Sequence, residues 1–386
     1  MHKVCALIVT AMFCAGALFL CAFTSAPRDT YFTIFYDSES VVITDEFLRG
    51  SWYNYEAQKK FAGGKNLYER AKTVSGKNPM KTIQKDFPEI WMIIERISKK
   101  VEVKAYDGYI MFYPDNMNKF KVVGQKQGRD LDEVRLCEDI LFGLQQGKHF
   151  NAIANVKNIL PRDEKDILAR IGLRGSYTTY FEQNEAREHN IALAFHAFNG
   201  LIVQKNETVS FNNVVGPRTR ERGYAEAKII LDGQFVPGVG GGVCQASTTL
   251  FNAALLSGLK IDKSYNHSLA ISYVPIGRDA MVSSAADLRF VNNTGGTIYI
   301  EAGVIPATDT KHGSAFVRVY GNKTDVKYRP RTVVTEHELG EDEIDPARES
   351  LTYIEAWKDD KLVHSKLVRK SKYKSRCKNT HACPEH

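Results

Sequence analysis

One cysteine of this chain stands where a nucleophile could be made. Cys244 follows three consecutive glycines and Val243, and it begins a run whose apolar residues have helical spacing. We therefore predict Cys244 at a helix N-terminus, where unpaired backbone N–H groups and the helix dipole favour a thiolate over a thiol. The glycines allow a positive φ and a close approach of the backbone to a substrate. The alternative is a packing role, since free cysteine is often buried.

A thiol nucleophile needs a base, and the base needs a third group that orients it. His267 follows Cys244 on a segment whose apolar residues alternate, as in a strand. Residues 275–278 read as a turn, and residues 280–290 read as the returning strand. The sequence therefore predicts a hairpin that carries His267 near the thiol.

The register of this predicted hairpin selects the orienting acid. If Val274 pairs with Asp279, antiparallel pairing places His267 within one residue of Asp287. At about 3.4 Å per residue, Asp279 would then lie about 20 Å or more from His267 along the strand. We therefore expect Cys244, His267 and Asp287 to form a catalytic triad and Asp279 to cap the turn.

Residues near the cysteine could bind a substrate. The side chain of Gln245, or backbone N–H groups near Gly242, could stabilise an oxyanion. Other candidates could line a groove for an acidic peptide or could instead satisfy loop carbonyl groups. These candidates are Gly241, Arg218, Arg222 and Tyr224. Such a site needs no cofactor, and the three consecutive glycines do not form a nucleotide-binding pattern.

Blocks rich in Gly, Asn and Thr surround the candidate residues from Gly172 to Ile300. They read Gly-Ser-Tyr-Thr-Thr-Tyr at 175–180, Val-Gly-Pro-Arg-Thr at 215–219, Gly-Gly-Gly-Val-Cys-Gln at 240–245 and Gly-Arg-Asp-Ala at 277–280. Together these blocks resemble the VanW family, an accessory family of glycopeptide-resistance gene clusters. The resemblance implies a VanW domain over residues 171–305 and a cell-envelope context, but no particular reaction.

The order of Cys at a helix start, then His, then Asp is also similar to that of transglutaminase-like and papain-like thiol enzymes. That similarity implies amide hydrolysis or acyl transfer through a thioester. With the envelope context, it makes peptidoglycan or its stem peptides the expected partner. Two alternatives remain: a non-catalytic peptidoglycan-binding or scaffold protein, and a redox-responsive protein in which Cys244 acts alone or pairs with Cys137.

The segment before the VanW-like blocks is predicted to be a small α+β unit over residues 101–170. We expect a hairpin of strands 101–106 and 109–112, a helix over 131–146 and a strand over 150–156. This order resembles a peptidoglycan-binding repeat found upstream of VanW domains, and a generic small domain is the alternative. Residues 27–100 receive no predicted role, although residues 83–97 have clear helical periodicity.

The two ends of the chain carry different signals. Lys3 precedes an apolar run over residues 4–23, long enough to cross a hydrocarbon core of about 30 Å. We expect residues 1–26 to be a transmembrane anchor rather than a cleaved signal peptide, with the soluble part outside the cytoplasm. Residues 306–386 are predicted to be a β-rich extension with a basic tail. Its expected strands lie at 315–320, 332–336, 352–358 and 361–368.

Composition adds limits to these predictions. The 386 residues are 43% hydrophobic and 25% charged, with a net charge of +7, which favours an anionic partner such as an acidic wall polymer. No motif for nucleic acid is present, so nucleic acid is not expected. The seven cysteines do not form a disulfide scaffold. Cys377 and Cys383 could pair, or could join His381 and His386 around a metal, and the spacing disfavours zinc. The predicted class is α+β.

Overall fold

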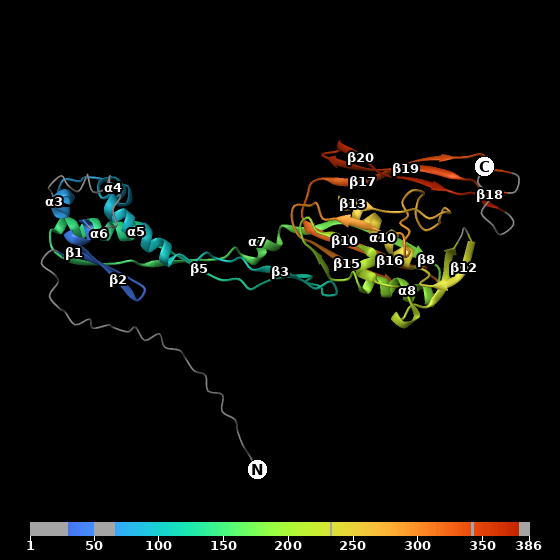
Figure 1. Ribbon diagram of the computed structural model, residues 1–386, viewed down its shortest axis with the longest axis horizontal. Helices are drawn as coiled ribbons and strands as arrows, with labels where there is room; N and C mark the ends of the chain where they lie inside the picture. Colours follow the sequence, from blue (N-terminus) through green and yellow to red (C-terminus); the bar gives the residue numbers. More distant parts are fainter. Residues whose placement is uncertain (1–29, 50–65, 232–233, 341–342, 378–386) are drawn as a thin grey trace, which may run out of the picture. The chain divides into compact units, whose positions relative to one another are not determined.

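The computed structural model describes residues 30–49, 66–231, 234–340 and 343–377. The fold is α+β, as predicted, and its contacts divide the chain into two compact units (Figure 1). The first unit holds the described residues up to Tyr106 together with Lys126–Pro161. The second holds Asp107–Gln125 and the described residues from Arg162 onward. The expected segment boundaries at residues 26, 100, 170 and 305 stay predictions.

The predicted membrane anchor, residues 1–26, lies outside the described residues. Among the residues that are described, the helices are all too short or too polar to span a bilayer. Anchoring therefore stays a prediction.

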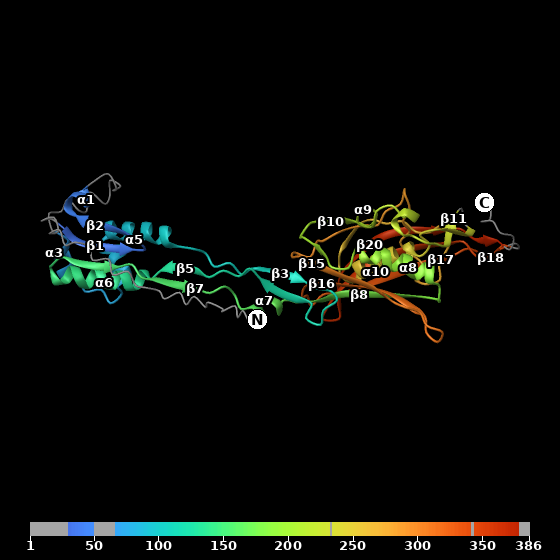
Figure 2. The same ribbon diagram turned by 90° about the horizontal axis from the view of Figure 1, so that it is seen from below.

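The first unit combines a small sheet with helices. Its sheet has the order β2-β1-β6, in which β1 pairs antiparallel with β2 and parallel with β6. Figure 2 shows α5 and α6 beside this sheet, and their apolar side chains share one core with β1. The strands are β1 (Thr30–Tyr36), β2 (Glu39–Thr44), β5 (Gly128–Leu131), β6 (Phe150–Ile153) and β7 (Val156–Ile159). The helices are α1 (Asp45–Arg49), α3 (Leu67–Lys72), α4 (Pro79–Asp86), α5 (Pro88–Val101) and α6 (Glu133–Gln146).

Capping residues explain the helix ends in this unit. The predicted helix over 131–146 is confirmed as α6, which begins after Asp132 and ends at Gly147, a left-handed residue. The predicted helix over 83–97 is two helices, because Pro88 lacks an N–H group and starts α5 directly after α4.

The predicted hairpin about residues 107–108 is wrong. The strand β3 (Tyr109–Phe112) pairs with β4 (Phe120–Val123) instead, and Tyr106 pairs with Lys126. The Asp-Gly pair that favoured a tight turn is therefore a point where the chain runs on without reversing.

The second unit is built on a four-stranded antiparallel sheet of order β8-β16-β15-β9. The strands are β8 (Ile171–Phe181), β16 (Gly313–Asn322), β15 (Ile298–Ile305) and β9 (Leu201–Val203). Two helices, α8 (Glu185–His196) and α10 (Val243–Leu256), pack against it and contribute to the same core. Short elements complete this part: α7 (Glu164–Leu168), β10 (Thr208–Ser210), α9 (Phe211–Val215), the 3₁₀ helix η1 (Arg220–Arg222), β11 (Glu226–Leu231), β12 (Gln234–Val239), β13 (Lys260–Lys263) and β14 (Arg289–Val291).

A second sheet, of order β17-β19-β20, lies on the other side of α10 from β8 and β16 (Figure 1). Its strands are β17 (Lys327–Glu336), β19 (Arg348–Lys358) and β20 (Lys361–Tyr373), and they confirm the strands predicted at 332–336, 352–358 and 361–368. The short β18 (Glu343–Asp345) and β21 (Arg376–Cys377) pair with each other. Because α10 is covered from both sides, nearly all its side chains are buried.

Candidate active site

Cys244 lies in the first turn of α10, as predicted. The helix begins after Gly242, whose φ of 107° belongs to the left-handed region that favours glycine. A Cβ atom at Gly242 would lie 2.9 Å from the carbonyl oxygen of Arg187, so no other residue fits there without movement. The neighbouring carbonyl of Gly241 accepts a hydrogen bond of 2.9 Å from Asn190 Nδ2. The turn before Cys244 is therefore held by the conformation that glycine allows at Gly242 and by the hydrogen bond from Asn190.

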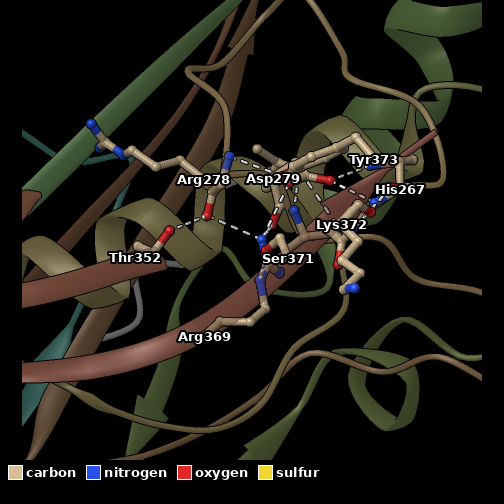
Figure 3. A network of polar contacts seen from close by, with 12 residues as sticks. His267, Arg278, Asp279, Thr352, Arg369, Ser371, Lys372 and Tyr373 are labelled. Atoms are coloured by element: carbon tan, nitrogen blue, oxygen red, sulfur yellow. Dashed lines mark hydrogen bonds and ion pairs between the residues drawn. The ribbon is translucent and has the colours of Figure 1, made fainter. Parts of the chain in front are cut away.

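His267 is not on a strand, and the predicted hairpin is wrong. The segment between β13 and β14 is irregular, with a single bridge between Tyr265 and Met281. Two residues inward from that bridge, His267 faces Asp279 across the base of a wide loop. The Nδ1 atom of His267 lies 2.7 Å from Asp279 Oδ2, and the backbone N–H of His267 donates to the same oxygen (Figure 3).

Asp287, the predicted orienting acid, lies elsewhere and has another partner set. Its Oδ2 atom accepts from Ser210 Oγ at 2.7 Å, and its Oδ1 atom accepts from the backbone N–H of Asn212 at 2.9 Å. These bonds cap the first turn of α9. The predicted pairing of Asp287 with His267 is therefore wrong. Residues 275–278 do form a turn, in which the N–H of Arg278 donates to the carbonyl of Pro275 at 3.1 Å, but the segments beside it do not pair as two strands.

The helix that carries Cys244 also holds Asp279 in place. The backbone N–H of Ala280 donates to Thr248 Oγ1 at 2.9 Å, and Ser247 Oγ donates to the carbonyl of Ala280. One turn further, Asn252 and Arg278 exchange two hydrogen bonds of 2.8 Å. The polar residues of α10 in these bonds are buried, so the irregular segment at 278–280 replaces water as their partner.

The electrostatics of the three groups favour an ion pair between thiolate and imidazolium. Burial alone would raise the pKa of the Cys244 thiol, but its hydrogen bond to His267 and the imidazolium charge outweigh burial and hold that pKa below its ordinary value. Burial likewise opposes the charged form of His267, yet hydrogen bonds to Asp279 and Cys244 raise its pKa to about 9. Despite burial, bonds to His267 and the charge of Arg369 keep the pKa of Asp279 below its usual range.

The thiol and the imidazole line a cleft of about 1630 Å³. His267 and Asp279 are only 5% and 1% exposed, so the reactive face of the triad is the Cys244 side. Among the titratable residues of the lining, cations outnumber anions. The cations are Arg187, Arg218, Lys228, Arg348, Lys374 and Arg376, and the anions are Glu336 and Asp345.

Residues 186–312, which include Cys244, His267 and Asp279, match the family model described as VanW like protein. This chain carries a VanW-like domain. Over 149 residues it is 48% identical to the uncharacterized protein YoaR of Bacillus subtilis, covering 38% of this chain and 49% of the relative. Over 122 residues it is 30% identical to the vancomycin B-type resistance protein VanW of Enterococcus faecalis, covering 30% of this chain and 44% of the relative.

The resemblance to the VanW family is thereby confirmed. The chain spans about half the length of the curated relatives that it matches. No solved structure matches it. The resemblance of residues 101–170 to a peptidoglycan-binding repeat stays a prediction.

Within the VanW-like domain, Gln245 is a structural residue and not a free donor. Its side-chain Nε2 donates to Thr179 Oγ1 at 3.0 Å and to the carbonyl of Tyr180 at 2.9 Å. Its Oε1 accepts from Arg187. Both amide hydrogens are engaged and the side chain is fully buried, so the expected role of this side chain at an oxyanion is wrong.

The other predicted binding residues separate into two groups. Arg218 and Gly241 line the cleft, and Arg218 is held by a 2.9 Å bond to Asn212 Oδ1. Arg222 instead donates to the carbonyl of Val215, and Tyr224 is buried in the core of the unit. For these last two residues the structure favours the loop and packing roles that were kept as the alternative.

Sequence reasoning missed three residues at this site: Asp279, Arg369 and Tyr373. Asp279 stood in the Gly-Arg-Asp-Ala block that carried the family resemblance, which was a usable signal. Arg369 and Tyr373 lie on β20, outside residues 186–312, and nothing in their spacing indicated what they face.

A metal or disulfide site was considered for the tail. Cys383, His381 and His386 lie outside the described residues, so that prediction stays open. In the part of the chain that the structure describes, no three His, Cys, Asp or Glu side chains are grouped to hold a metal ion.

Proposed function

We propose that the VanW-like domain is a cysteine-dependent amide hydrolase or acyl transferase that acts on peptidoglycan stem peptides. The observation that carries this proposal is the linked set of Cys244, His267 and Asp279, in which Cys244 and His267 line the cleft and Asp279 lies behind them. A nucleophile, a base and an orienting acid are the minimum set for thiol-based acyl transfer.

In the proposed reaction the Cys244 thiolate attacks an amide carbonyl carbon and forms a C–S bond. The carbonyl oxygen becomes an oxyanion, for which the backbone N–H of Cys244 is the natural donor, since it has no acceptor among the described residues. The N–H groups of Val243 and Gln245 already donate to Gly240 and Gly242. The His267 imidazolium gives its proton to the amide nitrogen as the C–N bond breaks, leaving a thioester and a free amine.

The thioester is then resolved by a second nucleophile. If water attacks, His267 takes a proton from it, and a carboxylic acid and the free thiol result. If an amine attacks, a new amide forms and the chain is a transferase. Asp279 supports the imidazolium through both halves, because its carboxylate accepts from Nδ1 and leaves the other ring nitrogen for the reaction.

The charge of the cleft supports an acidic peptide as substrate. Six cationic and two anionic residues line it, and Arg218 also favours the thiolate of Cys244 by its charge. A stem peptide carries free carboxylates and amide bonds, and so fits both the charge and the chemistry. The name of the Enterococcus faecalis relative, a vancomycin resistance protein, agrees with a cell-wall context.

The proposal is tested by incubating the full chain with defined muropeptides and following products by mass spectrometry. We expect a cleaved or transferred amide bond and, at early times, a thioester adduct on Cys244. Cys244→Ser and His267→Ala should each abolish turnover, whereas Arg222→Ala, at the end of η1 and outside the cleft lining, should not. A chain that binds sacculi equally well with Cys244→Ala and yields no product would instead be a binding module.

We also propose that residues 4–23 anchor the protein in the cytoplasmic membrane, with the VanW-like domain on the outer side, where peptidoglycan lies. The support is the length and apolarity of that run. Protease added to intact protoplasts should remove the domain. Protection from the protease until the cells are lysed would contradict this location.

A further inference from the structure

The two carboxylate oxygens of Asp279 have different partners. His267 belongs to residues 186–312, which match the family model, whereas Arg369 and Tyr373 lie outside that region. Its Oδ2 atom serves His267, as described above. Its Oδ1 atom accepts a 2.6 Å hydrogen bond from the Tyr373 hydroxyl and a 3.2 Å contact from Arg369 Nη2. Figure 3 shows Asp279 in a network of polar contacts with His267, Tyr373 and Arg369.

Both side chains come from one face of β20. Residues at alternate positions of a strand share a face, so Arg369, Ser371 and Tyr373 point to the same side. Ser371 and Tyr373 are buried, and Arg369 Nε donates to Ser371 Oγ at 2.9 Å. The intervening Lys370 and Lys372 are exposed. The pattern of β20 thus separates a face turned to Asp279 from a solvated one.

Strands β20 and β19 also form hydrogen bonds to the loop that carries Asp279. Arg369 Nη2 donates to the carbonyl of Asp279 at 2.8 Å and to that of Gly277 at 3.1 Å. The backbone N–H of Gly277 donates to the Tyr373 hydroxyl oxygen at 2.9 Å, and Thr352 Oγ1 donates to the Gly277 carbonyl at 2.8 Å. A Cβ atom at Gly277 would lie 2.6 Å from Thr352 Oγ1, so glycine is what allows this docking.

Arg369 is a costly residue to bury. Its side chain is 8% exposed, and its Nη1 atom has no hydrogen-bond partner among the described residues. A buried guanidinium with an unpartnered nitrogen is retained most readily where its charge meets an opposite one. The opposite charge here is Asp279, at 1% side-chain exposure.

We propose that Tyr373 and Arg369 are positioning residues for the thiol chemistry, and that the sheet β17-β19-β20 is therefore part of the catalytic unit. The inference rests on the function proposed above, because it assigns these residues to that reaction. Neither residue lines the cleft. They hold the Asp279 carboxylate ionised and aimed at His267, which in turn stabilises the imidazolium that supports the thiolate.

This role predicts a specific change in thiol titration. Without the Tyr373 hydroxyl or the Arg369 charge, the Asp279 carboxylate takes up a proton at higher pH and is free to turn from His267. The imidazolium then loses support, and the Cys244 thiolate forms only at higher pH. A purely structural role for β20 would lower stability without moving the titration.

The experiment is the pH dependence of Cys244 alkylation in the full chain, resolved by peptide mass spectrometry. Tyr373→Phe removes one oxygen atom, and we expect it to move the acid limb upward by about half to one pH unit. Arg369→Met should shift the limb further than Arg369→Lys, which keeps a cation near Asp279. The matched control is Tyr353→Phe on β19, a tyrosine that contacts Arg331 and not the site, and it should not shift the limb.

The outcomes separate this inference from the proposed function. If the acid limb of Tyr373→Phe coincides with that of Tyr353→Phe in folded protein, the positioning role is overturned. Tyr373→Phe decides the matter even if Arg369→Met fails to fold. A shifted limb without turnover of any muropeptide would overturn the proposed reaction and keep the positioning role. An unperturbed thiol in the unaltered chain would overturn both.

Discussion

At the scale of single residues, two aspartates of the same loop region have different surroundings. Asp279 is almost fully buried between His267, Tyr373 and Arg369, whereas Asp287 caps α9 through Ser210 and Asn212. An acid that orients a base and an acid that caps a helix respond differently to loss of charge, so the pair allows a matched comparison.

We predict that Asp279→Asn lowers kcat/KM by about 10²- to 10⁴-fold, because a neutral amide no longer stabilises the His267 imidazolium. Asp287→Asn should leave the rate nearly unchanged and cost about 1 kcal/mol of stability through the weakened cap. Turnover assays and urea unfolding of both variants check this. Equal loss of activity in the two variants would contradict the assignment of Asp279.

The charge state of His267 predicts the alkaline limb of the reaction. The pKa of His267 is raised to about 9, and its protonated form is the acid for the leaving amine. We expect kcat/KM to fall about tenfold per pH unit above about 9. Because the folded-state pKa is raised, the same proton stabilises the fold at low pH, and that stability is lost as pH rises through about 9. Rate profiles and unfolding midpoints at pH 7 to 10 measure both; His267→Gln should remove the part of the pH dependence of the midpoint that comes from His267.

Residue-level reasoning from the sequence placed Cys244 at a helix start and His267 near it, but it put His267 on a strand and chose the wrong acid. The cysteine was predictable because glycine and helix signals are local. The choice of the acid depended on the register of two paired strands, but the segments on either side of the turn at residues 275–278 share only the bridge between Tyr265 and Met281. What decides the path of these segments is the set of bonds from Thr248, Asn252 and β20, which no local pattern encodes.

At the scale of elements, α10 performs two tasks. Its N-terminus presents Cys244, and its buried polar residues hydrogen-bond to the irregular segment at 278–280. The helix and its glycine start were predicted. The burial of its polar residues was not, because it depends on elements that cover the helix from both sides. Predicted strands of the C-terminal extension were also confirmed, whereas the contact of this sheet with the site could not be predicted.

The turn before α10 gives a prediction at this scale. In Gly242→Ala the new Cβ meets the carbonyl of Arg187 at 2.9 Å with φ near 107°, so the helix start must shift at a cost of about 1 to 3 kcal/mol. We expect Cys244 alkylation to slow and its acid limb to move upward. Gly295→Ala is the control, since Gly295 also has a positive φ of 79° but nothing within 4 Å of its Cβ position. It should lower stability slightly and leave the thiol unchanged, and a slower thiol in both variants would contradict a local effect.

At the scale of the whole molecule, the two described free thiols belong to different units. Cys137 is fully buried in α6 of the first unit, and burial and the charges of Glu133 and Glu138 raise its pKa to about 12. Cys244 is half-buried at the cleft of the second unit. The redox alternative in which Cys137 pairs with Cys244 therefore has one partner that is buried.

We predict that iodoacetamide labels Cys244 in the native protein and labels Cys137 only in denaturant. Peptide mass spectrometry at neutral pH distinguishes the two sites, and Cys137→Ala should retain the titration of Cys244. Recovery of a Cys137–Cys244 disulfide from oxidised native protein would contradict this prediction and revive the redox alternative.

The bond between Asp279 and Tyr373 joins residues 94 positions apart. If that bond completes the site, the order of synthesis controls when the thiol becomes reactive. A growing chain that has already displayed Cys244 and His267 still lacks β20, and its thiol remains an ordinary one. On this proposal the pKa of Cys244 falls only after β20 has folded against Asp279, so an unfinished chain does not carry a reactive thiolate.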